Sequence, residues 1–76
     1  SSRAGVYLRV SSMDAPEAKR TKLLLEIFEG GCPVCFKAED TGKLLRAPRG
    51  LWCDPNSVLL RELGVTLGDE NVKKLD

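Results

Sequence analysis

Apolar and polar residues alternate along two stretches of the chain, and this pattern predicts β-strands. In the sequence Val-Tyr-Leu-Arg-Val that begins at Val6, the aliphatic side chains fall on one face, and Tyr7 and Arg9 fall on the other. A strand of this kind is buried on one side only. We therefore expect it to lie in a sheet with one covered and one exposed face.

The second alternating stretch spans residues 32–38 and contains the sequence Cys-Pro-Val-Cys. Val34 and Phe36 lie on one face of the predicted strand, whereas Cys35 and Lys37 lie on the other. This stretch is therefore expected to contribute to the same covered and exposed faces.

A tight turn is expected after this strand. Glu-Asp-Thr-Gly at residues 39–42 combines Asp, which bonds its own backbone, with Gly, which accepts a positive φ. A further strand is expected over residues 43–47. Pro-Arg-Gly at residues 48–50 breaks it, and residues 51–53 are candidates to extend it beyond the break.

Apolar side chains spaced three and four residues apart predict a first helix over residues 14–28. Asp14 and Glu17 have the spacing of a capping box, and Pro16 is tolerated in a first turn. The Gly-Gly pair at residues 30–31 is expected to end the helix, because glycine accepts the left-handed conformation of a C-terminal cap.

A second helix is predicted over residues 56–67 from a stripe of leucines. Asp54, Asn56 and Ser57 are all suitable N-caps, so the start of the helix is open at this stage. Gly68 is suited to the C-terminal cap.

The predicted order is therefore strand, helix, strand, strand, helix and a short final strand over residues 71–75. We expect an α+β fold of the ferredoxin-like, split βαββαβ type, with a four-stranded antiparallel sheet and both helices on one face. In that topology the strand from Cys32 is an edge strand, where the missing N–H of Pro33 does least harm. The uncovered face is predicted to carry Tyr7, Arg9 and some residues of the hairpin, and it is a natural docking surface.

The composition is that of one small globular domain covering residues 1–76: 42% of the residues are apolar, 30% are charged, and the net charge is +1. So small a chain buries about 60% of its unfolded surface, which leaves little room for a substrate pocket. No apolar run approaches the ~20 residues of a membrane span, and no signal peptide is visible. Together with an odd number of cysteines, this predicts a cytoplasmic protein with reduced thiols. Residues 1–3 are expected to be disordered or a remnant of cloning.

The Cys-Pro-Val-Cys sequence invites a redox interpretation. A redox dithiol places its first cysteine at a helix N-terminus, where the helix dipole lowers the thiol pKa. Here Cys32 leads into a predicted strand, and three residues of strand separate its Cα atom from that of Cys35 by about 10 Å. Because a disulfide does not close over that distance, the sequence favours two separate thiols.

Zinc binding is the other interpretation of the cysteines. The spacing between Cys35 and Cys53 falls within the range of a two-knuckle zinc site. A closed site needs four ligands, yet the chain has no His, and an oxygen ligand such as Asp54 would have to complete the set. The sequence therefore favours packing roles for Cys32, Cys35 and Cys53, with no metal and no cofactor.

Catalysis and nucleic-acid binding find little support in the sequence. No Ser or Thr stands near an evident base and the chain has no His, so no catalytic residue is predicted. Basic residues near one Trp are suited to contact a phosphate backbone and stack a base, which leaves single-stranded DNA binding as an alternative. The net charge near zero argues against it. That alternative depends on Lys43, Arg46, Arg49 and Trp52, whereas the candidate partner-binding residues are Tyr7, Arg9, Arg46, Arg49 and Trp52.

Six phrases of the sequence carry a family resemblance. They are Val-Tyr-Leu-Arg-Val at 6–10, Gly-Cys-Pro-Val at 31–34, Glu-Asp-Thr-Gly-Lys-Leu-Leu at 39–45, Arg-Ala-Pro-Arg-Gly-Leu-Trp-Cys-Asp-Pro at 46–55, Leu-Leu-Arg-Glu-Leu at 59–63 and Leu-Gly-Asp-Glu-Asn-Val at 67–72. Together these phrases resemble the extreme C-terminal segment of the bacterial DNA polymerase III α subunit, over nearly the whole chain from Ala4. The family more often has apolar or aromatic residues in place of the three cysteines and a charged residue in place of Gly64.

The resemblance implies a noncatalytic segment. In that family the catalytic aspartates lie far upstream in the palm domain, and the C-terminal segment follows an OB-fold and binds the tau subunit of the clamp loader. The implied function is protein docking in DNA replication, with tau and other replisome proteins as partners and DNA reached through the parent polymerase. The parent chain would be a DNA-directed DNA polymerase, a nucleotidyltransferase. A small zinc or redox module and a single-stranded DNA-binding domain are the alternatives.

Overall fold

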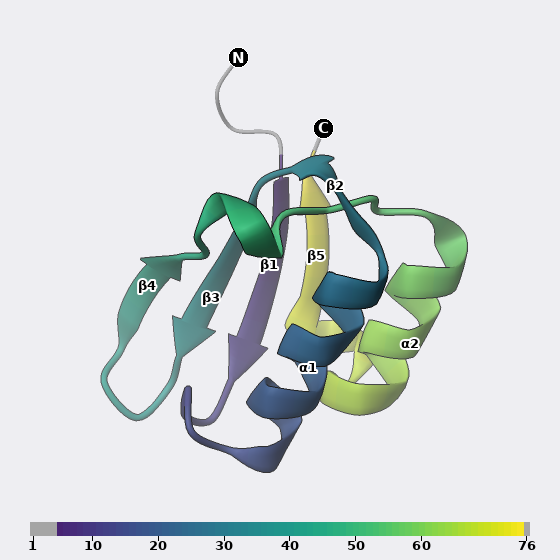
Figure 1. Ribbon diagram of the computed structural model, residues 1–76. Coiled ribbons are helices and arrows are strands. Elements are labelled where there is room, and N and C mark those ends of the chain that lie inside the picture. The colour runs from purple at the N-terminus through teal and green to yellow at the C-terminus, as the bar shows by residue number, and fades with distance from the viewer. Residues whose placement is uncertain (1–4, 76) are drawn as a thin grey trace.

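Two helices and a four-stranded sheet make up the fold in the computed structural model, which describes residues 5–75 (Figure 1). The expectation for residues 1–3 lies outside the described residues. In chain order the elements are β1 (Gly5–Val10), α1 (Pro16–Ile27), β2 (Glu29–Cys32), β3 (Val34–Ala38), β4 (Lys43–Arg46), the 3-10 helix η1 (Arg49–Leu51), α2 (Ser57–Leu67), the 3-10 helix η2 (Asp69–Asn71) and β5 (Val72–Leu75).

The sheet is mixed and has the strand order β4-β3-β1-β5. The central strands β1 and β3 are parallel, whereas β4 and β5 are antiparallel to their neighbours β3 and β1. The predicted α+β class is confirmed, but the fully antiparallel sheet and the ferredoxin-like strand order are wrong. In the ferredoxin-like order, another strand lies between β1 and the sheet strand that follows α1. Here the chain passes from α1 through β2 to β3, and β3 pairs directly with β1. This is a helical crossover between parallel neighbours.

The position of Pro33 explains why the predicted edge strand is an internal strand. Pro33 lies between β2 and β3, so the alternating stretch 32–38 is interrupted and β3 begins at Val34. The missing N–H of Pro33 therefore costs β3 no ladder hydrogen bond. The carbonyl oxygen of Pro33 instead accepts a hydrogen bond from the Val6 N–H at 2.9 Å. The sheet edges are β4 and β5.

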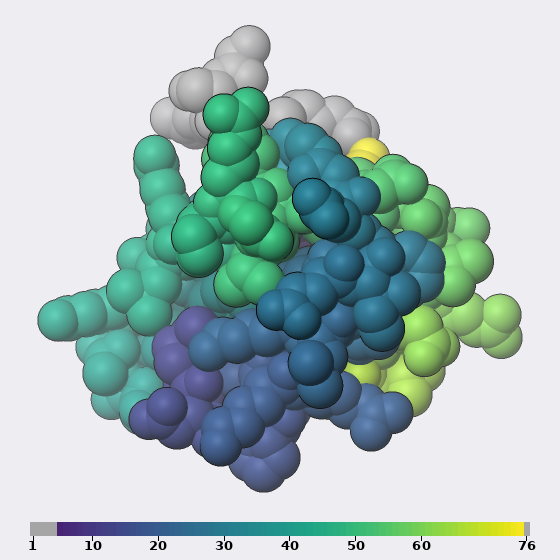
Figure 2. Space-filling model, viewed as in Figure 1, coloured from purple at the N-terminus to yellow at the C-terminus, as the bar shows by residue number. Residues whose placement is uncertain are grey.

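The core lies between one face of the sheet and the two helices, which both cover that face (Figure 1). In the space-filling view from the same side, the residues of α1 lie in front, and those of α2 lie beside them on the side away from β4 (Figure 2). The predicted alternation is confirmed, since β1 and β3 direct every second side chain into the core. Burying one large aliphatic or aromatic side chain contributes about 1.5–3 kcal/mol. The largest fully buried side chains are Phe36, Leu8, Leu25, Leu59, Leu63, Val6, Val10 and Val34.

The helix starts differ in how they are capped. At α1 the N-cap is Ala15, which has no side-chain cap hydrogen bond, and Pro16 begins the helix. The predicted capping box from Asp14 is wrong, because Glu17 accepts a hydrogen bond from the Ser11 hydroxyl at 3.2 Å instead. At α2 the N-cap is Asn56, one of the three predicted candidates. Its side-chain oxygen accepts a hydrogen bond from the Leu59 N–H at 2.9 Å.

The segment after α1 also differs from the prediction. The helix ends at Ile27, and Gly30 and Gly31 belong to the extended strand β2 rather than to a helix cap. Two backbone hydrogen bonds flank Gly30: its N–H donates to the Trp52 carbonyl at 3.1 Å, and the Asp54 N–H donates to the Phe28 carbonyl at 2.7 Å. This close approach leaves no space for a side chain at residue 30. A Cβ atom there would lie 2.6 Å from the Asp54 nitrogen.

We expect Gly30→Ala to destabilise the fold by roughly 1–3 kcal/mol, because the new methyl group would displace backbone atoms of Cys53 and Asp54. The matched control is Gly31→Ala, where a Cβ atom would meet nothing within 4 Å. The control should change the free energy of unfolding by less than about 1 kcal/mol. Urea unfolding followed by circular dichroism measures both. Equal stability of the two variants would contradict the backbone packing described at residue 30.

Candidate functional site

Among residues 5–75, no helix or strand covers the face of the sheet opposite α1 and α2 (Figure 1). Residues directly opposite one another in a ladder share a face. The strand register therefore places Tyr7, Cys35, Arg46 and Lys73 in one row of this surface and Arg9, Lys37 and Leu44 in the next. We call the surface formed by these residues the open face.

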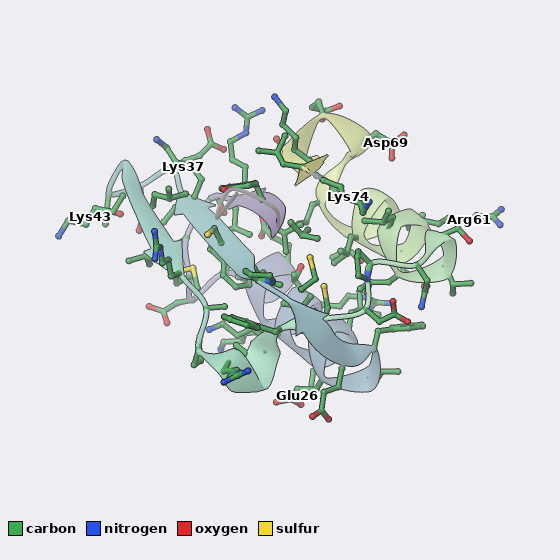
Figure 3. The ribbon with its side chains drawn as sticks, turned by 90° about the horizontal axis from the view of Figure 1, so that it is seen from above. Glu26, Lys37, Lys43, Arg61, Asp69 and Lys74 are labelled. Atoms are coloured by element: carbon green, nitrogen blue, oxygen red, sulfur yellow. The ribbon has the colours of Figure 1, made fainter. Side chains whose placement is uncertain are left out.

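Positive charge dominates the open face. Its basic side chains are all exposed, and the strand positions that the register places on this face include no Asp or Glu. Figure 3 shows Lys37 projecting from the side of the molecule opposite Glu26 of α1. The basic residues of the open face are Arg9, Lys37, Arg46 and Lys73.

Asn71 holds one of these cations in place. The Arg9 Nε donates a hydrogen bond to the Asn71 Oδ1 at 2.7 Å, and the Asn71 Nδ2 donates to the Leu67 carbonyl at 2.6 Å. The end of α2 thus orients a basic side chain of β1. An Arg that is already oriented loses less conformational freedom when it binds an anionic group.

A hollow of about 150 Å³ lies at one end of the open face. Aromatic and aliphatic groups form much of its wall, and Arg46 also lines it. We call it the Tyr7–Trp52 hollow, and its lining includes Tyr7, Pro33, Cys35, Arg46, Ala47 and Trp52.

Trp52 is fixed by two contacts. Its indole N–H points at the Ala47 carbonyl oxygen, at 3.4 Å, which is long for a hydrogen bond. The Arg49 guanidinium carbon lies 5.4 Å from the centre of the Trp52 ring, within the range of a cation–π interaction. Trp52 is half-buried, so the ring forms a wall of the hollow and does not protrude as a platform.

The structure brings the candidate partner-binding residues together. Tyr7, Arg9 and Arg46 lie on the open face, Trp52 lines the hollow, and Arg49 contacts Trp52. The alternation of residues 32–38 predicted Lys37 on this face, although Lys37 was not a named candidate. Leu44 belongs to the hairpin residues that were expected here without being named. Lys73 was not predicted here, because its place depends on β5 lying beside β1. Leu44 is 56% exposed and adds apolar surface to the open face.

The cysteines occupy two separate places, and all three are free thiols. Cys32 packs against the core and forms an isolated β-bridge with Cys53. Cys35 lies on the open face between Tyr7 and Arg46. The structure therefore separates the environments of the two thiols in the Cys-Pro-Val-Cys sequence, as the alternation predicted.

The structure does not bring a set of metal ligands together. Cys35 lines the hollow, whereas Cys53 is fully buried on the core side of the molecule. Within residues 5–75, no three His, Cys, Asp or Glu side chains gather closely enough to hold a metal ion. Over the same residues, no helix is both long enough and apolar enough to cross a membrane.

The titration of Cys53 is shifted by its burial. Burial, with smaller contributions from Cys32 and Asp54, raises the pKa of its thiol to about 11. Such a thiol carries almost no thiolate at neutral pH, and thiolate is the nucleophilic form. Cys53 is therefore suited to packing, which agrees with its place in the core cluster.

Comparison of the chain with protein families, curated proteins and solved structures yields no match.

We expect the thiols to differ in reactivity. Cys32 and Cys35 are half-buried and should react with a thiol reagent in the folded protein, whereas Cys53 should react only on unfolding. Mass spectrometry of the alkylated, digested chain identifies the modified sites. Modification of Cys53 as fast as that of Cys35 in the folded state would contradict its burial.

The raised pKa of Cys53 also predicts a loss of stability at alkaline pH. Below the ordinary thiol pKa of 9, both folded and unfolded chains keep the proton, so this group contributes nothing to the pH dependence. Between pH 9 and about 11 the unfolded chain loses the proton first, which favours unfolding. Urea titrations over this window should show a steeper fall in the wild type than in Cys53→Ala. If the free energy of unfolding fell equally with pH in the two proteins, the pKa of Cys53 would not be raised by folding.

Proposed function

We propose that this chain is the C-terminal protein-docking domain of a bacterial DNA polymerase III α subunit and that it binds the tau subunit of the clamp loader. The proposal starts from the resemblance of the six sequence phrases that run through most of the chain. In this role the fragment is noncatalytic. The parent polymerase carries out nucleotidyl transfer, in the cytoplasm.

The open face is the observation that supports docking best. Each layer of a small domain has to bury one apolar face, and here the helices cover only one side of the sheet. The other side presents Tyr7, Leu44 and four exposed basic side chains on the rigid backbone of a sheet, and Asn71 orients one of the four, Arg9. A rigid surface that combines apolar and charged groups is suited to recognise a protein.

The side chains on the open face also lack the arrangement that catalysis needs. A nucleophile requires a base within hydrogen-bond distance, and that base is held by a third group. Cys35 is the nucleophilic residue of this face, and its neighbours across the ladder are Tyr7 and Arg46. The ladder places no His, Asp or Glu directly beside Cys35. The face therefore fits recognition better than chemistry.

The two alternatives rest on fewer observations. A zinc or redox module depends on the cysteines acting together, whereas the structure places Cys35 apart from the Cys32–Cys53 pair. A single-stranded DNA-binding domain depends on the basic residues near Trp52, and Trp52 is half-buried beneath Arg49. Thiol counting, metal analysis and oligonucleotide titration separate these alternatives from docking.

The direct test is a calorimetric titration of the folded chain with the C-terminal region of the tau subunit encoded by the same genome. We expect saturable binding. In a primer-extension assay the chain alone should incorporate no nucleotide. The absence of heat at high micromolar concentrations, with both proteins shown to be folded by circular dichroism, would overturn the proposal.

A further inference from the structure

We propose that the open face binds an extended acidic protein segment, and that this segment places one large apolar side chain in the Tyr7–Trp52 hollow. The inference deepens the docking function proposed above and rests on it for the biological partner. It states the chemistry of that partner, which the resemblance does not give.

The charge of the open face indicates the charge of its partner. Net charge over the whole chain is +1, yet the open face holds Arg9, Lys37, Arg46 and Lys73 with no acidic residue at its strand positions. The strand positions of this face therefore carry positive charge alone, and the acidic side chains lie outside them, in the turns that border the sheet and on the helices, as Glu26 on α1 does (Figure 3). Complementary potentials steer a partner and fix its orientation. The partner that fits this face carries several carboxylates.

The geometry of the cations favours an extended segment. Arg46 and Lys73 belong to the edge strands β4 and β5, and Arg9 and Lys37 lie in the central strands between them. Neighbouring strands lie about 4.8 Å apart, so the cations are spread across the width of the sheet. A partner in extended conformation spans such a distance with few residues, whereas one phosphate or one carboxylate reaches only part of it.

The Tyr7–Trp52 hollow supplies the apolar part of the recognition. An apolar cavity of about 150 Å³ accommodates a benzene molecule, and the hollow has a volume of about 150 Å³. Its walls include Pro33, Ala47 and the two aromatic rings. One Leu, Met or Phe side chain fits this space, and anchor side chains of this kind dominate the energy of many interfaces.

A protein segment fits the open face better than single-stranded nucleic acid. Strand binders present aromatic rings on which successive bases stack. Over residues 5–75 every aromatic side chain is buried or half-buried, and Arg49 already lies over the Trp52 ring. The hollow accepts one group at one end of the face, and it offers no row of stacking positions.

The groove between α1 and α2 is a larger depression, of about 680 Å³, but its charged residues are not all of one sign as they are on the open face. Glu17 and Glu62 line it together with Lys19 and Arg20. The mixed charges favour no partner of one sign, so this groove carries no proposal.

The test is a selection of random dodecapeptides displayed on phage against the complete folded chain. We expect the selected peptides to be rich in Asp and Glu and to share one Leu, Met, Phe or Trp. Their affinity should fall as salt is added, because carboxylates bind exposed cations. Replacing the shared apolar residue by Ala should weaken binding about tenfold.

Variants of the chain locate the binding surface. Lys37→Glu combined with Arg46→Glu should weaken the selected peptides at least about tenfold, because both charges on the face are reversed. Ala47→Leu should do the same by filling the hollow. The matched control is Arg61→Glu, an exposed charge reversal on α2, which should leave the affinity unchanged (Figure 3). Thermal unfolding verifies that each variant is folded.

Three results would overturn the inference: selected peptides without acidic residues, no selected peptide at all, or binding that is insensitive to Lys37→Glu/Arg46→Glu. Tighter binding of oligothymidylate than of any peptide would assign the face to nucleic acid instead. The proposed function fails separately. If tau does not bind but acidic peptides bind through Lys37 and Arg46, only the polymerase assignment falls. If tau binds equally to wild type and Lys37→Glu/Arg46→Glu, only the acidic-segment inference falls.

Discussion

The parallel pairing of β1 with β3 is the interaction on which the rest of the structure depends. It runs from Val6 beside Val34 to Val10 beside Ala38 and sets every second side chain of both strands against the helices. The same register sets Tyr7 beside Cys35 and Arg9 beside Lys37 on the other side. Since a shift by one residue would exchange the two faces, core formation and the composition of the open face have a single cause.

Much of this arrangement could be predicted from local patterns. The alternation identified the buried and exposed faces along residues 6–10 and, within the predicted stretch 32–38, along β3 from Val34 onward. The turn at Gly42, which has a positive φ of 70°, was expected from its sequence. Strand direction was not predictable in this way, because parallel and antiparallel strands can show the same alternation. Pro33 was placed in an edge strand on the assumption that it lay within the ladder. It lies between β2 and β3, so that constraint did not apply.

The candidate site was predictable only in part, for a related reason. Tyr7, Arg9 and Arg46 were named from their own segments, whereas the contribution of Lys73 depends on β5 lying beside β1. The hollow likewise requires Trp52 to approach β1 and β3, which are distant from it in sequence. The bridge between Cys53 and β2 holds this segment, and Gly30 permits the close approach. Contacts of this kind come from the tertiary fold and leave little trace in a local pattern.

The central claim is that the open face, and not the helical face, meets the protein partner. The most direct measurement is nuclear magnetic resonance of the isotope-labelled chain during titration with the tau C-terminal region. The account predicts that the shifted signals come from β1, β3, β4, β5 and the indole N–H of Trp52, while the exposed surfaces of α1 and α2 are unaffected. Shifts confined to the exposed surfaces of α1 and α2 would contradict it.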